Sequence, residues 1–213
     1  VSGMKHQKIW IARGWATCAF AFVFGAQVSQ PKPLTKSAVL SLVVAWPPIA
    51  SSTMHLIQQR GISFSPTDEY IQMLGRATGG RNNAVLEKTI RGAKVTPSIN
   101  AEVSTEAALL QHLERCGELN STPSSGQHSS DAEAECQAAQ SLAPRDPFVL
   151  LALGTSMRQQ QKVKQAAAVY KQAVAIDSNL ALGHILLADA LFGQGSEDRD
   201  EGLVEGLTAL RLD

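Results

Sequence analysis

Residues that could do metal or thiol chemistry are few and scattered along this chain. The five histidines, at positions 6, 55, 112, 128 and 184, include no pair with the spacing of metal ligands. The three cysteines, Cys18, Cys116 and Cys136, form no paired-cysteine motif. The sequence therefore predicts no metal site and no bound cofactor.

Two other stretches carry candidate catalytic groups. "TDEY" at 67–70 places Asp68 beside Glu69, but negative charge is typical of the first turn of a helix. "GRATGGRNN" at 75–83 has glycines but lacks the Gly-Lys-Ser/Thr of a phosphate-binding loop. We therefore expect no catalytic residue and no enzyme. The alternative is an accessory domain of an enzyme or of a secretion or assembly system, with its site within 35–95.

Composition narrows the fold class and the kind of partner. The 213 residues include 19 basic and 19 acidic side chains, so no basic surplus indicates nucleic-acid binding. Aromatic residues make up only 5 %, whereas strands favour aromatic and β-branched residues. These features predict an all-α protein that does not bind nucleic acid.

The first 30 residues differ from the rest. A basic start, "MKHQKIWIARG", precedes an apolar core, "WATCAFAFVFGA", that is shorter than the ~20 residues of a membrane-spanning helix. This plan predicts a signal peptide, and an uncleaved N-terminal anchor is the alternative. The expected location is the periplasm or cell envelope, with membrane contact only through this segment if it is retained.

Residues 31–95 are expected to form a small N-terminal module of four short helices. Thr35 or Ser37 can begin the first helix, Gly61 can end the second, and Ser65 or Thr67 can cap the third. The expected helices cover residues 35–45, 49–60, 65–77 and 84–94.

The segment after residue 96 begins with two helices around a polar stretch. The first is expected at 104–119, capped by Ser104, and the second at 131–144. Between them, "NSTPSSGQHSS" at 120–130 lacks helical periodicity and is rich in Ser, Pro and Gly. We expect a mobile loop there.

A repeat then becomes visible. Ala139 and Ala173 close similar amphipathic runs 34 positions apart, and Leu153 and Leu187 have the same spacing. A third run closes at Ala209, 36 positions after Ala173. A period of this length is typical of stacked helical hairpins, none of which can bury its apolar face alone.

Residues 147–180 resemble a tetratricopeptide repeat. The family's characteristic positions fall on Leu150, Leu153, Gly154, Met157, Ala166, Tyr170 and Ala173. Units at 104–146 and 181–213 match less well, and Gly202 and Gly206 stand where Ala and an aromatic residue are usual. The resemblance covers about half of the chain, within 96–213. Residues 56–74 also resemble a segment that precedes such repeats in secreted or envelope proteins of soil bacteria.

The resemblance implies an all-α array and a non-catalytic binding scaffold of the bacterial cell envelope. Its concave groove would bind an apolar helix or an extended peptide. Leu151 and Thr155 replace the Lys and Asn with which family members grip acidic chaperone tails, so such a ligand is not expected. The family's groove positions fall on Phe148, Leu151, Thr155, Arg158, Leu182, Ile185, Asp189 and Phe192.

Cys116 and Cys136 are expected on neighbouring antiparallel helices. Cys136 occupies the place of the family's aromatic residue, which faces the partner helix. The two cysteines can form a disulfide, or each can serve as a small buried apolar residue. The sequence leaves both possibilities open.

Overall fold

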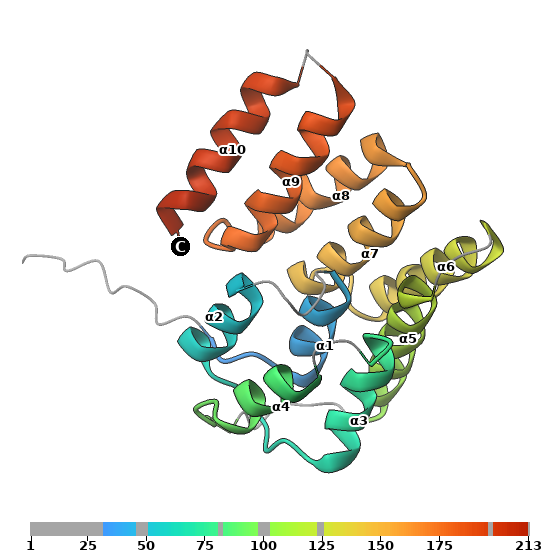
Figure 1. Cartoon of the computed structure of the whole chain (residues 1–213), viewed down its shortest axis with the longest axis vertical. Helices are drawn as coiled ribbons and strands as arrows, with labels where there is room; N and C mark the ends of the chain where they lie inside the picture. Colours follow the sequence, from blue (N-terminus) through green and yellow to red (C-terminus); the bar gives the residue numbers. More distant parts are fainter. Residues whose placement is uncertain are drawn as a thin grey trace, which may run out of the picture. The chain divides into compact units, whose positions relative to one another are not determined.

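The computed structural model describes residues 32–45, 51–80, 83–97, 103–122, 126–195 and 198–212. These residues belong to one compact unit, Pro31–Asp213. They form helices and no strand, so the predicted all-α fold is confirmed (Figure 1). The predicted signal peptide or anchor, residues 1–30, lies outside the described residues. Within the described ranges, no helix combines the length and apolar character needed to cross a bilayer.

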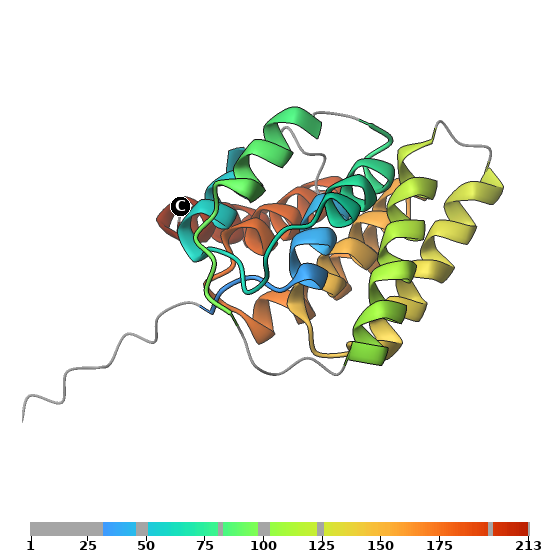
Figure 2. The same ribbon diagram turned by 90° about the horizontal axis from the view of Figure 1, so that it is seen from below.

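The helices fall into an N-terminal group and three antiparallel pairs. The N-terminal group comprises α1 (Lys36–Ala45), α2 (Ser51–Arg60), α3 (Asp68–Ala77) and α4 (Asn83–Arg91). The pairs are α5 (Val103–Ser121) with α6 (Gly126–Leu142), α7 (Pro147–Gln159) with α8 (Val163–Ile176), and α9 (Ala181–Gln194) with α10 (Arg199–Leu212). Each pair packs on the next through α6 against α7 and α8 against α9 (Figures 1 and 2).

Polar side chains begin several helices, and two of them, Thr35 and Thr67, were among the candidates predicted from the sequence. The Thr67 hydroxyl accepts a hydrogen bond from the Tyr70 amide at 3.2 Å, and the Thr35 hydroxyl accepts one from the Ala38 amide at 3.1 Å. Asp146 caps α7 in the same way by accepting from the Phe148 amide. Each cap satisfies a backbone donor that has no partner inside its own helix.

The loop predicted at 120–130 is too long. Helix α5 continues to Ser121 and α6 already begins at Gly126, so most of the polar stretch is helical. Helix α5 also begins at Val103, one residue before the expected cap, Ser104. The two helices pack along each other, and this tertiary packing overrides the weak helix propensity of Ser and Gly.

Helix α1 lies in the core. Every residue from Ser37 to Ala45 is buried, and the helix packs against both α5 and α7. A helix that is apolar all round needs neighbours on all sides. The N-terminal module and the helix pairs therefore share one hydrophobic core.

Three extended segments meet beside this core. Leu34 and Val95 each form a parallel bridge with Ile62, which the sequence did not predict. The Leu34 amide donates to the Gly61 carbonyl at 3.0 Å, and the Ile62 amide donates to the Lys94 carbonyl at 2.8 Å. Gly61 has φ of 70°, and a Cβ there would lie 2.5 Å from the Lys94 oxygen, so only glycine fits.

Gly117 lies where α5 closely approaches α1 and α3. An added Cβ would lie 2.6 Å from the Ala77 carbonyl oxygen and 2.8 Å from Cγ2 of Val44. We expect Gly117→Ala to lower the free energy of unfolding by about 1–3 kcal/mol, because backbone must move to admit the methyl group. Chemical denaturation followed by circular dichroism measures this change.

Gly206→Ala is the matched control, because an added Cβ at this helical position meets no atom within 4 Å. Alanine there should raise stability by about 0.5–1 kcal/mol through its better helix propensity. Equal effects of the two substitutions would contradict the close approach at Gly117.

Candidate protein-binding groove

The predicted groove positions lie on α7 and α9, the first helices of the second and third pairs. On α7, Phe148, Leu151 and Thr155 are buried, with relative exposures of 8 %, 0 % and 3 %. Helix α1 of the same chain packs on α7, and the Thr155 hydroxyl donates to the Ala45 carbonyl at 2.8 Å. A segment of the chain itself therefore covers this part of the predicted groove.

Thr155 connects three helices through two hydrogen bonds. Its single hydroxyl proton is donated to the carbonyl oxygen of Ala45. Ala45 is the last residue of α1, so this carbonyl has no hydrogen-bond partner within the helix. The Tyr170 hydroxyl lies 2.9 Å from the Thr155 oxygen and must donate to it. Burial raises the pKa of Tyr170 to about 12, so the phenol keeps this proton at neutral pH.

The N-terminal module also contacts the repeat through Arg60 at the end of α2. Its guanidinium lies 3.2 Å from a carboxylate oxygen of Asp177, just after α8. The same group lies 5.7 Å from the centre of the Phe148 ring, within the range of a cation–π contact. The side chains of Arg60 and Asp177 are largely buried. The Phe148 ring is likewise buried, and residues of the same chain cover it.

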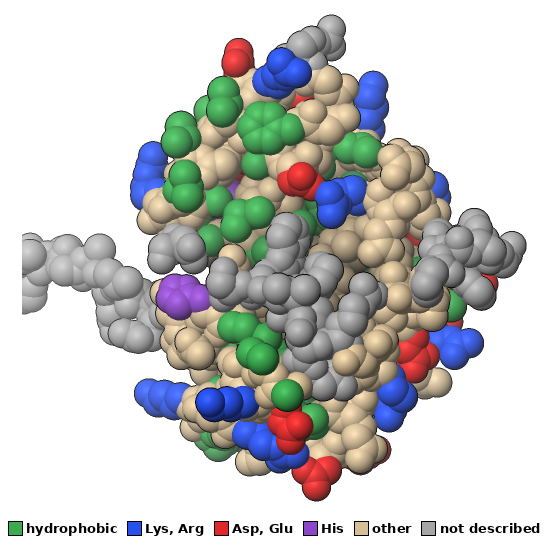
Figure 3. Space-filling view, in the orientation of Figure 1, with side chains coloured by type: hydrophobic (Ala, Val, Ile, Leu, Met, Phe, Trp, Pro, Cys, Tyr) green, Lys and Arg blue, Asp and Glu red, His purple; other side chains and the backbone are tan. Residues whose placement is uncertain are grey.

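The part of the groove on α9 is more open. Leu182 is buried, Ile185 is half-buried, Asp189 is exposed, and Phe192 has a relative exposure of 46 %. Arg158 of α7 forms an ion pair with Asp189, which joins the two helices. Hydrophobic side chains gather over α9 and α10 in the space-filling view (Figure 3). The structure thus divides the predicted groove into a covered part on α7 and an open part on α9.

His184 holds α9 in place. It is buried, and its Nδ1 lies 2.5 Å from a carboxylate oxygen of Glu205 on α10. Its Nε2 lies 3.1 Å from the Ser178 carbonyl oxygen in the turn before α9. This histidine packs between helices, so its role is structural.

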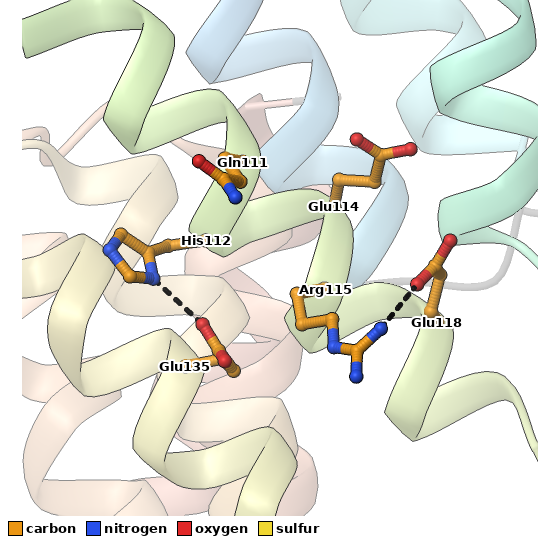
Figure 4. A pocket seen from close by; sticks show the side chains of 6 residues that line it. All are labelled: Gln111, His112, Glu114, Arg115, Glu118 and Glu135. Atoms are coloured by element: carbon orange, nitrogen blue, oxygen red, sulfur yellow. Dashed lines mark hydrogen bonds and ion pairs between the residues drawn. The ribbon is translucent and has the colours of Figure 1, made fainter.

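A polar hollow on α5 and α6 is a second concave feature (Figure 4). His112 lies 2.7 Å from Glu135, Arg115 lies 3.6 Å from Glu118, and Glu114 pairs with Arg76 at 2.5 Å. Its charged side chains are thus already engaged with one another or with a neighbour. The residues lining it are Gln111, His112, Glu114, Arg115, Glu118 and Glu135.

The described residues support neither a metal site nor a catalytic role for the "TDEY" stretch. No group of three or more His, Cys, Asp or Glu within the described ranges could hold a metal ion. Asp68 lies in the first turn of α3, 2.6 Å from Arg91, and Glu69 is exposed beside it. Both carboxylates lie in the first turn of α3, where negative charge stabilises a helix.

Cys116 and Cys136 form a disulfide between α5 and α6. Their Cα atoms lie 5.5 Å apart, and both residues are fully buried. Of the two possibilities open from the sequence, the structure has the bonded one. The bond links α5 to α6. In this pair the first helix, α5, matches the tetratricopeptide positions poorly.

The packing of α1 on the α7 part of the groove was not predicted from the sequence. The available signal was the run "SAVLSLVVA" at 37–45, which has no charged face and must be buried on all sides. Its neighbours could not be identified from periodicity, because Ala45 and Thr155 are 110 positions apart.

Comparison with known protein families matches residues 139–195 to the model of a TPR repeat. The matched segment runs from the last turn of α6 through α7, α8 and α9. No curated protein and no solved structure shows significant similarity to the chain.

Proposed function

Because residues 139–195 match the model of a TPR repeat, we propose a non-catalytic scaffold that binds a partner on the α9 part of the predicted groove. Such repeats typically mediate protein–protein interactions and are generally without catalytic activity. Stacked helix pairs bring the first helix of each unit to one concave surface. The single observation that carries the proposal is that α1 covers this surface on α7 while the positions on α9 stay open.

The chemistry of the open part favours an apolar helix or peptide. Ile185 and Phe192 offer apolar surface, and Arg158 and Asp189 offer one charge of each sign beside it. Helix α1 shows what the neighbouring α7 surface accepts: an apolar helix whose last carbonyl takes a hydrogen bond from Thr155. We infer that the partner presents a similar helix to α9, as in other helix-in-groove complexes.

We further propose that the protein works in the periplasm or cell envelope. Support comes from the basic and apolar pattern of residues 1–30 and from a buried disulfide, which persists in oxidising compartments. The partner would then be another envelope or exported protein.

A photo-crosslinking experiment tests the binding surface. We expect a photoreactive phenylalanine analogue at position 192 to crosslink a specific partner in cells, because this ring is half exposed in the open α9 part of the groove. Adding Ile185→Glu should reduce the adduct at least about tenfold, because a buried charge without a partner is costly at an interface. Mass spectrometry identifies and quantifies the adduct.

Val85 provides the control, because it is 58 % exposed on α4, away from the groove. The same analogue at position 85 should not give this adduct, and Val85→Glu should leave the position-192 adduct unchanged. An adduct that is equally strong with Ile185→Glu, in a chain that keeps its helical circular dichroism, would contradict the proposed surface.

A further inference from the structure

Helix α10 exposes an apolar stripe on the side away from α9. Leu203, Val204, Leu207 and Leu210 have relative exposures of 56 %, 60 %, 62 % and 77 %. The buried residues of this helix, Gly202 and Ala209, lie on the opposite side, against α9. Spacings of three and four residues place the exposed four on one helical face. Figure 3 shows hydrophobic side chains gathered over this helix.

The same face carries one charge near each of its ends. Asp200, Val204, Leu207 and Arg211 follow one another at spacings of four, three and four residues, so they form one line along α10. Neither Asp200 nor Arg211 forms an ion pair with another described residue. The other acids of α10 are engaged, Glu201 with Lys171 and Glu205 with His184.

This line of residues is complementary to itself when it is reversed. In an antiparallel pair of α10 helices, Asp200 of one copy faces Arg211 of the other, and Val204 faces Leu207. Both pairings occur twice, because a twofold axis repeats every contact. A parallel pair would instead place like charges together, at a cost in free energy.

We propose that α10 binds the α10 of a second copy of this chain, antiparallel and about a twofold axis. The apolar stripe supplies the buried centre of the contact, and two Asp200–Arg211 pairs lie at its edges. Buried apolar surface provides the affinity of such an interface, and the charges fix its direction. An apolar helix of another protein is the competing occupant, and it would not need the charge pattern.

Sedimentation equilibrium of the full chain tests the proposal. At a protein concentration of about 100 µM we expect a dimer, and Leu207→Glu should raise its dissociation constant at least about a hundredfold. Val85→Glu makes the same change at an exposed position on α4 and should leave the dimer intact. A monomeric wild-type chain, or a dimer indifferent to Leu207→Glu, would overturn the proposal.

Charge reversal tests the antiparallel direction. Asp200→Arg should weaken association at least about tenfold, because it places two positive charges together at each edge. Combining Asp200→Arg with Arg211→Asp exchanges the two charges within each copy and should restore the dimer. A helix damaged by the first substitution would not recover in this way. Failure of the double variant to restore association would overturn the antiparallel arrangement.

Discussion

Tyr170→Ala is expected to lower the free energy of unfolding by about 3–5 kcal/mol, because it removes a fully buried aromatic ring. The ring lies directly on Gly154, where an added Cβ would be only 2.4 Å from its edge. The alanine also leaves the Thr155 oxygen without its donor. Denaturant unfolding followed by circular dichroism measures the loss, which is a large share of the stability of a typical domain.

Tyr170→Phe separates the ring from its hydroxyl. It keeps the packing against Gly154 and removes only one hydrogen bond, so we expect a loss of about 0.5–1.5 kcal/mol. The Thr155 hydroxyl can still donate to Ala45 in this variant. If alanine and phenylalanine cost the same, the ring does not carry the packing between α7 and α8.

Removal of the Cys116–Cys136 disulfide is expected to have the next largest effect. The bond closes a loop with a sequence separation of 20, and restriction of the unfolded chain by such a loop contributes about 3 kcal/mol. Comparing the thermal unfolding of the oxidised protein with that of Cys116→Ala/Cys136→Ala measures this contribution. The double variant should keep its helices, because α5 and α6 remain packed along their length.

The redox dependence supplies the control for the disulfide. A reductant should lower the melting temperature of the wild-type chain and leave that of the double alanine variant unchanged. Peptide mass spectrometry of unreduced protein should recover the two cysteines linked to each other. Recovery of both as free thiols from unreduced protein would contradict the bond.

Much of the helical array could be predicted from the sequence, because its determinants are close together along the chain. Gly154 and Tyr170 are 16 positions apart on adjacent helices, so the small residue and the ring that covers it belong to one hairpin. Thr35 and Thr67 cap their helices through amides three positions later, which is again local chemistry. The antiparallel course of α5 and α6 also brought Cys116 and Cys136 within reach of each other.

Helix propensity predicted the wrong structure where tertiary packing opposed it. Residues 120–130 are rich in poor helix formers, yet α5 and α6 occupy most of this stretch. The free energy of packing two long helices along each other exceeds the few tenths of a kcal/mol per residue that propensity contributes. The bridges of Ile62 with Leu34 and Val95 escaped prediction for a related reason, because no repeat or periodicity links such distant positions.

The sequence by itself determined the helices, the repeat and which residues are apolar enough to line a groove. Only the tertiary structure decided which of those residues stay open. Phe148, Leu151 and Thr155 are covered by α1 and α2 of the same chain, whereas Phe192 remains exposed. Periodicity identifies the apolar face of a helix, but the hydrophobic effect is non-directional and does not specify what that face will meet. The partner of each face depends on the whole chain, because all helices compete for the same buried surface.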